Sequence, residues 1–176
     1  MSPAFFIDML VMRRILKKVL LVLICSVSAF YANAQNGSYI FNHKLVASIL
    51  SESYGIPASV ILAVAAVESS GGQGPAAKVL NNHFGIVGKN SFINKRGHSS
   101  RYKEYNNELA SYLDFCKLIS HKRFYHKLKG NTDCIAWVKA ISNCGYSEQP
   151  EQWKQKVLSV LYSMKLQSSY SLAFGK

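Results

Sequence analysis

The sequence predicts a mainly α-helical domain (α+β class) with a small irregular or hairpin lobe in its middle. Apolar residues recur at helical spacing through most of residues 41–164, and glycine or proline separates successive segments. Residues 85–107 instead mix glycines with polar side chains and show no 3.6-residue period, which is typical of a loop or short hairpin. No repeat or low-complexity linker interrupts residues 39–166, so we expect one domain.

The first two helices are predicted from their boundaries and their apolar faces. An amphipathic helix is expected over about 41–53, and Gly55 suits the position just after its end. Pro57 suits the first turn of a second helix, residues 57–69, which is apolar on nearly all sides and therefore belongs in the centre of the domain. A short helical turn should follow from Pro75, in the segment PAAKVL.

The later helices are predicted in the same way. Helical spacing returns over 108–119, and the cap-forming residues at 131–133 should begin a helix that continues to Ser142. Gly145 ends that helix, and the last one should run from Pro150 to about Met164. The remaining tail has no clear period, so we expect it to fray.

Residues 1–34 are expected to be a secretory signal peptide. The basic stretch MRRILKK precedes an apolar run over 19–30, and Ala32-Asn33-Ala34 forms a cleavage signature. An apolar run of about 12 residues is too short to span a membrane. Cleavage would leave residues 35–176 as the mature domain, with its core at about 40–165. The alternative is that the segment is retained as an N-terminal anchor.

The chain is strongly basic, with a formal net charge of +12. Residues 1–34 hold four basic residues and one acid, so the mature domain would carry about +9. An exported protein with this charge should be attracted to anionic polymers of the cell envelope, such as peptidoglycan. Nucleic acid is the usual alternative partner for a basic protein, but export argues against it.

The cysteine and histidine spacing predicts no metal site and no cofactor. Cys116, Cys134 and Cys144 follow the cleavage site, which in an oxidising compartment suggests one disulfide and one free thiol. Cys134 and Cys144 would lie roughly 15 Å apart along one helix, so Cys116 would pair with either of them. His121 and His126 fall off a common helical face, and no zinc-type spacing is present.

The stretch VILAVAAVESSGG, residues 60–72, ends a buried helix with a carboxylate. The helix dipole disfavours a negative charge at this end, so Glu68 stands where local rules would not place it. Burial raises the pKa of a carboxyl group, which allows it to hold a proton near neutrality and act as a general acid. An isolated glutamate at a helix end is more often an ordinary exposed residue. Other motifs are therefore needed to show whether Glu68 is a general acid.

Four segments, taken in order, resemble one enzyme family. They are ILAVAAVESSGG, NNHFGI, YNNELASYLDF and GYSEQP, the last followed by Trp153. They resemble the bacterial peptidoglycan-hydrolysing N-acetylglucosaminidases (glycoside hydrolase family 73), whose pattern reads ILAQAALESGWG, NNLFGIKG, FRxYxSxxESxxDH and GYATDPxY. The resemblance covers about residues 40–165. It implies a lysozyme-like helical fold with a small lobe across a glycan-binding cleft.

The resemblance also implies roles for individual residues. Glu68 falls on the catalytic glutamate, the general acid for the glycosidic oxygen. Asn82, His83 and Phe84 fall in the segment that lines the cleft, and Tyr146 matches a cleft tyrosine. These four are the expected substrate-binding residues, although Phe84 would equally suit the core and His83 an ordinary loop.

The remaining matched residues are interpreted as structural. Tyr105, Ser111 and Asp114 match the middle block, and the last two share one helical face. Trp153 is interpreted as a packing residue.

The sequence departs from the family pattern at the lobe. Many family members carry a second acidic residue there, whereas VGKNSFINKRGHSSRYK contains none. Glu104 and Glu108 are the nearest acids, and Glu108 is expected to begin a helix. Two mechanisms need only one glutamate: attack by the 2-acetamido group of the sugar, and the lytic transglycosylase route through a 1,6-anhydro ring.

The sequence therefore predicts a peptidoglycan hydrolase, exported to the periplasm or cell envelope, that acts as an endo-β-N-acetylglucosaminidase. The alternatives are a lytic transglycosylase or muramidase of the same fold, or an inactive module that binds wall glycan. The expected partner is the glycan strand of peptidoglycan. No nucleic acid, no stable membrane span after cleavage and a monomeric state are predicted.

Overall fold

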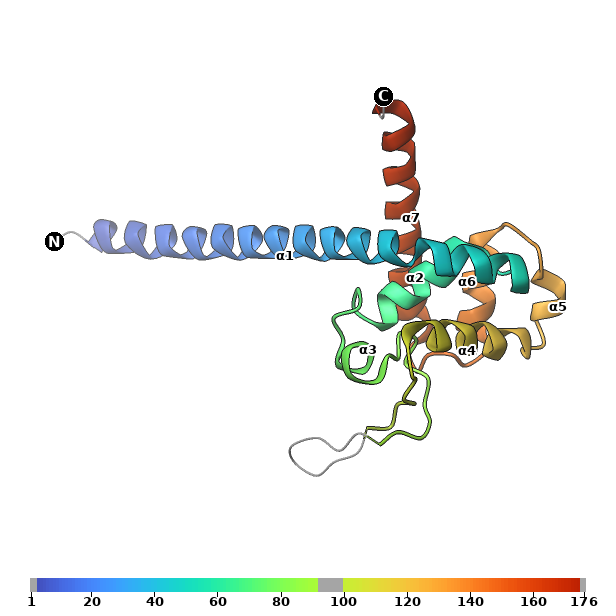
Figure 1. The fold of residues 1–176 in the computed structure, drawn as a ribbon. Helices are drawn as coiled ribbons and strands as arrows, with labels where there is room; N and C mark the ends of the chain where they lie inside the picture. The colour runs from blue at the N-terminus through green and yellow to red at the C-terminus, as the bar shows by residue number, and fades with distance from the viewer. Residues whose placement is uncertain (1–2, 92–99, 175–176) are drawn as a thin grey trace. The chain divides into compact units, whose positions relative to one another are not determined.

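The computed structural model describes residues 3–91 and 100–174. The chain divides into two compact units, Met1–Gln35 and Asn36–Lys176. Helix α1, Pro3–Tyr54, begins in the first unit and ends in the second (Figure 1). Among the described residues, no helix combines the length and apolar character that crossing a membrane requires. The signal peptide expected over 1–34 stays a prediction.

The second unit is helical, as predicted. After α1 its helices are α2 (Ala58–Glu68), α3 (Pro75–Leu80), α4 (Glu108–Ser120), α5 (Tyr125–Leu128), α6 (Cys134–Asn143) and α7 (Pro150–Phe174). Three features differ from the prediction. The helix expected over about 41–53 is the last part of α1, which begins well before residue 41. Helix α5 was not expected, because a single turn is too short to show a period. Helix α7 continues beyond Met164 instead of fraying, and no glycine or proline interrupts the sequence before Gly175.

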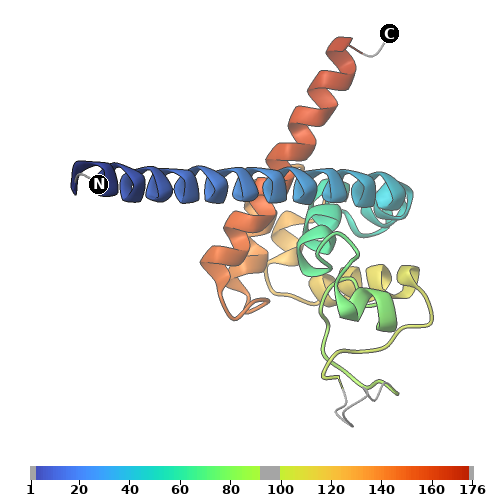
Figure 2. The same ribbon diagram turned by 90° about the vertical axis from the view of Figure 1, so that its left-hand side faces the viewer.

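Helix α2 forms the centre of the hydrophobic core. Every residue from Val60 to Ala66 is at most 3% exposed, which confirms that this helix is buried on all sides. It contacts α4, α6 and α7, and both ribbon views show it among these helices (Figures 1 and 2). Glu68 is the last residue of this helix, so the core ends directly at a carboxylate.

The lobe between α3 and α4 is a hairpin at its base. Val87 and Tyr102 form an antiparallel bridge, and Gly88 N donates to the carbonyl of Arg101 at 3.0 Å. One step closer to the domain, Lys103 N donates to the carbonyl of Ile86 at 2.8 Å. This pairing confirms the predicted hairpin at the base of the segment. Residues 92–99 lie outside the described residues.

Side-chain caps explain where two of the helices begin. The Asn107 side chain accepts a hydrogen bond from Ala110 N, so α4 begins at Glu108 as expected. The Asp133 carboxylate accepts from Ile135 N and Ala136 N at the start of α6. An acid at the start of a helix also interacts favourably with the helix dipole.

The expected disulfide is absent among the described cysteines. Cys116, Cys134 and Cys144 are free thiols. Cys116 is fully buried in α4, while Cys134 Sγ lies 3.2 Å from Ser59 Oγ and Cys144 Sγ donates to the carbonyl of Ile141. The prediction was wrong because the three side chains have different surroundings, which cysteine counting does not reveal.

Candidate active site

A tight left-handed turn ends helix α2 immediately after Glu68. Gly71 and Gly72 have φ values of 62° and 79°, and Gly71 N donates to the carbonyl of Ala66 at 2.8 Å. The Ser69 hydroxyl accepts a hydrogen bond from Gly72 N. Gly72 also lies against an aromatic ring, since a Cβ at this position would be 3.0 Å from Tyr39. The backbone therefore turns away and leaves the Glu68 side chain at the rim of the core.

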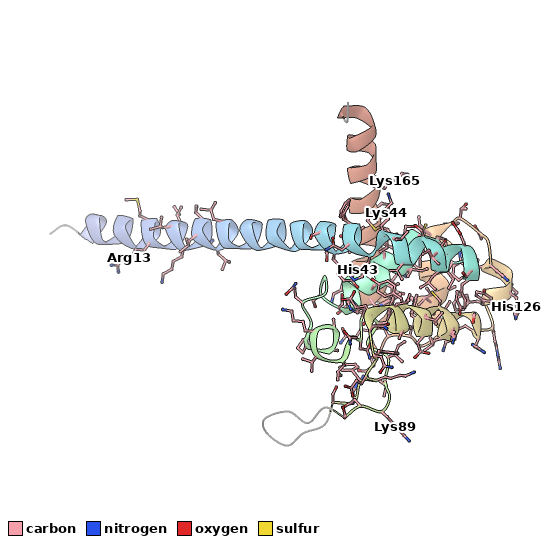
Figure 3. The ribbon with its side chains drawn as sticks, in the orientation of Figure 1. Arg13, His43, Lys44, Lys89, His126 and Lys165 are labelled. Atoms are coloured by element: carbon pink, nitrogen blue, oxygen red, sulfur yellow. The ribbon has the colours of Figure 1, made fainter. Side chains whose placement is uncertain are left out.

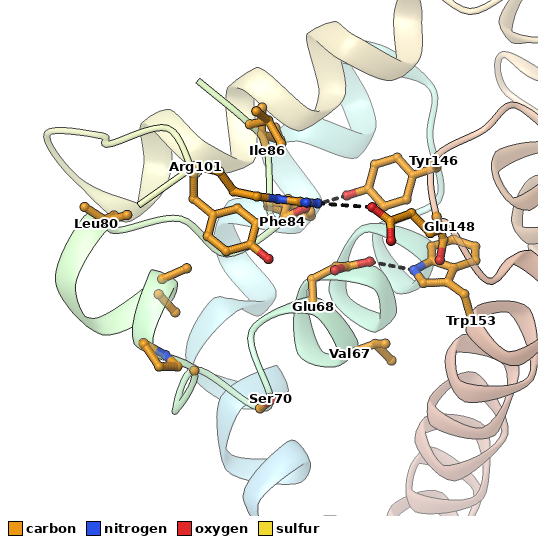
Figure 4. Close-up of a pocket in the computed structure, with 18 of the residues that line it drawn as sticks. Val67, Glu68, Ser70, Leu80, Phe84, Ile86, Arg101, Tyr146, Glu148 and Trp153 are labelled. Carbon is orange, nitrogen blue, oxygen red and sulfur yellow. Dashed lines mark hydrogen bonds and ion pairs between the residues drawn. The ribbon is translucent and has the colours of Figure 1, made fainter. Parts of the chain in front are cut away.

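Glu68 lines an open pocket of about 1040 Å³. The walls come from the end of α2, helix α3, the segment 84–87, residues 100–102, the end of α4, residues 145–149 and the first turns of α7. Figure 4 shows the Glu68 carboxylate directed toward Trp153, with Arg101, Glu148 and Tyr146 nearby. The pocket thus lies between the helical core and the base of the hairpin lobe.

The Glu68 carboxyl group is held by one strong hydrogen bond. Trp153 Nε1 donates to Glu68 Oε1 at 2.6 Å. Burial raises the pKa of the Glu68 carboxyl above its usual value, while this hydrogen bond and the positive charge of Lys156 oppose the change. A carboxyl group with a raised pKa and a fixed orientation has the properties of a general acid.

The second carboxyl oxygen lies beside a glycine. A Cβ built on Gly85 would be 3.3 Å from Glu68 Oε2, so a larger residue would crowd this oxygen. Gly85 has a φ of 64°, a conformation that side-chain-bearing residues rarely adopt. The glycine therefore allows the hairpin backbone to pass close to the acid.

Tyr146 lies next to this pair, as its match to the family suggested. Its hydroxyl donates to the carbonyl of Phe84 at 2.8 Å, and its ring packs against Trp153 with centroids 5.4 Å apart. Burial, and then the negative charge of Glu68, raise the pKa of the Tyr146 hydroxyl well above its usual value. Tyr146 therefore stays protonated and connects the segment before Gly85 to α7.

The structure does not bring Asn82 and His83 into the pocket. The Asn82 amide donates to the carbonyls of Ile86 and Lys103, each at 2.8 Å, and is 1% exposed. His83 is 3% exposed and lies 2.6 Å from the Tyr39 hydroxyl. Both side chains therefore contact other groups inside the protein, and neither lines the pocket.

Phe84 lies at the pocket wall but is a core residue. Its side chain is 2% exposed and stacks on Phe115 with centroids 4.2 Å apart. Its carbonyl accepts the hydrogen bond from Tyr146. Of the two interpretations that the sequence left open for Phe84, the packing one describes its side chain.

Trp153 and Glu148 line the pocket without having been predicted there. Trp153 was interpreted as packing, because a tryptophan near a helix start carries no signal of its hydrogen-bond partner. Glu148 belongs to the matched segment GYSEQP, and with Glu68 it supplies the acidic groups among the pocket-lining residues. It is 86% exposed and forms an ion pair with Arg101 at 3.4 Å.

The middle block is structural, as expected. Asp114 Oδ2 accepts from the Tyr105 hydroxyl at 2.7 Å and from Lys103 Nζ at 2.6 Å. Partial burial would raise the pKa of Asp114, but these two partners outweigh it and hold the pKa below its usual value. Ser111 accepts a hydrogen bond from His83 N. The block therefore ties the hairpin lobe to α4.

This fold and this pocket are those of a lysozyme-like helical glycoside hydrolase domain, with one oriented carboxyl group at the end of a buried helix. Residues 44–166 match the family profile "Glucosaminidase: Mannosyl-glycoprotein endo-beta-N-acetylglucosaminidase". The chain therefore belongs to the glucosaminidase family and is a glycoside hydrolase. Comparison with curated protein sequences gave no significant match.

Solved structures share the fold at low sequence identity. The glycoside hydrolase domain of Salmonella typhimurium FlgJ superposes with a TM-score of 0.62 at 22% identity, covering 78% of this chain and 95% of that one. The catalytic domain of the Listeria monocytogenes autolysin Auto gives 0.60 at 19% identity, covering 75% and 85%. A peptidoglycan hydrolase from Sphingomonas sp. A1 gives 0.57 at 21% identity, covering 70% and 86%.

Proposed function

We propose that this glycoside hydrolase cleaves the glycan strands of peptidoglycan as an endo-β-N-acetylglucosaminidase, with Glu68 as the general acid. The observation that supports this role most directly is the hydrogen bond from Trp153 to a carboxyl group whose pKa is raised by burial. Protonation of a glycosidic oxygen requires such a group.

The hydrogen bond also determines where the acidic proton resides. An indole N–H only donates, so Glu68 Oε1 must accept from Trp153. The proton of the neutral acid therefore resides on Oε2, the oxygen beside Gly85 at the pocket wall. This proton is transferred to the leaving oxygen of the scissile bond.

The second half of the reaction is inferred from the two acids that line the pocket, of which Glu68 is partly buried and Glu148 is exposed. Glu148 is exposed and paired with Arg101, so it resembles a surface residue more than a buried nucleophile. The 2-acetamido group of the N-acetylglucosamine unit attacks the anomeric carbon as the bond to the leaving oxygen breaks. Glu68, now ionised, then removes a proton from the water that opens the intermediate.

The charge of the pocket favours an anionic glycan. Arg101, Lys122 and Lys156 line it, against the two acids Glu68 and Glu148. Peptidoglycan carries carboxylates on its muramic acid units and peptide stems, which these cations would attract. The relatives named as an autolysin and a peptidoglycan hydrolase support the same substrate class. Export through residues 1–34 to the periplasm or cell envelope completes the proposal.

The test is digestion of purified sacculi by the full chain and by Glu68→Gln, with reduced products identified by mass spectrometry. The variant should lose at least about 100-fold in rate, since general acid catalysis contributes that much. Glu52→Gln, on an exposed part of α1, is the matched control and should digest like the wild type.

The product ends distinguish the mechanisms. Reducing N-acetylglucosamine ends support the proposal, whereas 1,6-anhydromuramic ends would identify a lytic transglycosylase. Equal behaviour of the wild type and Glu68→Gln would show that Glu68 is not the acid. Binding to sacculi without any cleavage would identify a wall-binding module.

A further inference from the structure

Two histidines and a glutamate lie close together outside the pocket. His43 comes from α1, His83 follows α3, and Glu108 begins α4. His43 Nε2 lies 3.0 Å from Glu108 Oε2, and His83 Nε2 lies 3.7 Å from Glu108 Oε1. The three ligand atoms lie within 4.8 Å of one another. None of these residues lines the pocket that contains Glu68.

The other ring nitrogens are already engaged. His43 Nδ1 donates to the carbonyl of Tyr39 at 2.7 Å, and Nε2 faces Glu108 Oε2 (His43 is labelled in Figure 3). In the neutral imidazole this leaves Nε2 with the lone pair, which can bind a metal ion in place of a hydrogen bond to the carboxylate. His83 Nδ1 lies 2.6 Å from the Tyr39 hydroxyl, and a proton on Nδ1 likewise leaves a lone pair on Nε2. Within the part of the chain that the structure describes, His83 Nε2 has no hydrogen-bond partner.

We propose that His43, His83 and Glu108 bind a divalent transition metal of the zinc type. Tetrahedral zinc with imidazole and carboxylate ligands places its ligand atoms about 3.3–3.5 Å apart. Here each Nε2 lies near a different oxygen of Glu108, at 3.0 and 3.7 Å, and the three ligand atoms lie within 4.8 Å of one another, so the side chains would move slightly closer together around the ion. Backbone and hydroxyl groups that hold the second ring nitrogen are the usual outer partners of metal-binding histidines.

A simple ion pair does not account for the third group. The contact between His43 and Glu108 satisfies those two side chains, whereas His83 Nε2 is buried without a hydrogen bond and only approaches Glu108 Oε1 to 3.7 Å. A buried group without a hydrogen bond costs about 1–3 kcal/mol in general. A metal ion satisfies all three. Two imidazoles and one carboxylate favour zinc over magnesium or calcium, which prefer oxygen ligands. The side chain of Glu108 is 57% exposed, so an ion and its water can enter from that side.

The metal would act as a structural clamp. It would join α1, the segment before Phe84 and the start of α4, and so hold the backbone beneath the pocket. The sequence predicted no metal, because its ligands stand far apart along the chain and match no zinc-type spacing. This inference does not depend on the role of Glu68.

Zinc binding to the full chain without an affinity tag provides the test. After chelator treatment and dialysis, titration calorimetry with ZnCl₂ should show one ion per chain, and zinc should raise the melting temperature. Co²⁺ should give the visible absorption of a tetrahedral site. MgCl₂ should change neither the melting temperature nor the titration.

The variants His43→Gln and Glu108→Gln should bind zinc more than about 100-fold more weakly, because losing even an outer partner costs 10–100-fold. Glu104→Gln, a neighbouring exposed acid, and His121→Gln are controls that should bind like the wild type. Glu68→Gln should also bind normally, which separates this result from that of the proposed function. Absence of stoichiometric zinc, or unchanged affinity in His43→Gln and Glu108→Gln, would overturn the proposal.

Discussion

Replacing Trp153 with phenylalanine removes the hydrogen bond to Glu68 and keeps an aromatic ring in place. The indole N–H stands 2.6 Å from Glu68 Oε1, so it stabilises the carboxylate that forms as the proton leaves. A hydrogen bond to a charged group contributes about 1.5–3 kcal/mol and one to a neutral group about 0.5–1.5. The difference of about 1–1.5 kcal/mol corresponds to a fall in kcat of about 5- to 15-fold.

The same change should shift the pH dependence in a defined direction. The hydrogen bond lowers the pKa of Glu68 against the effect of burial, so its removal raises that pKa further. A general acid loses activity as pH rises through its pKa. The alkaline limb of the kcat profile should therefore move to higher pH in Trp153→Phe, measured by digestion of dye-labelled sacculi across a pH series.

The matched control is Trp137→Phe. Trp137 is fully buried and its Nε1 donates to the carbonyl of Asn131, away from the pocket. This variant loses an equivalent hydrogen bond and should lose stability, but its alkaline limb should coincide with that of the wild type. An unchanged kcat and an unmoved limb in Trp153→Phe would refute the role that we assign to the indole.

Three further changes test the surroundings of the acid. Gly85→Ala should destabilise the domain by about 1–2 kcal/mol in denaturant unfolding and reduce digestion, because φ is +64° and the new Cβ would stand 3.3 Å from Glu68 Oε2. Glu148→Gln should digest sacculi at a rate within about threefold of the wild type, because an exposed ion pair contributes little. A loss as large as that of Glu68→Gln would make Glu148 a second catalytic group. Asp114→Asn should have a lower melting temperature than the wild type at pH 7. The pKa of Asp114 is lowered in the folded state, so protonation at low pH removes the stabilisation that its ion pair with Lys103 provides. The difference in melting temperature should therefore shrink as pH falls below 3.8.

The helices were predictable because their signals are local. An apolar run with Pro57 before it and glycines after it defines α2, helical spacing from Glu108 predicts α4, and the cap residue Asp133 marks the start of α6. The position of Glu68 at the end of the buried helix follows from the same pattern. These features depend on residues close together in sequence, where spacing and dihedral preference act directly.

The partners of the site were not predictable, because they depend on tertiary packing. Trp153 lies 85 residues from Glu68, and nothing in its local sequence reports that contact. Asn82 and His83 belong to a motif that adjoins the pocket, yet their side chains turn inward to carbonyl and hydroxyl groups. A motif locates a segment, whereas side-chain direction depends on how that segment packs.

The two hydrogen bonds from the Asn82 amide separate the lobe into an anchored base and an interchangeable outer part. One side chain fixes the carbonyls of Ile86 and Lys103, on the two arms of the hairpin, at the same distance of 2.8 Å. Residues 87 and 100–102, next to those carbonyls, line the pocket. The part of the lobe beyond these positions can therefore be lengthened, shortened or exchanged while the wall beside Glu68 keeps its shape. Enzymes with different glycan preferences could be obtained from this scaffold by grafting loops onto the outer part of the lobe and leaving Glu68 and the pocket wall unaltered.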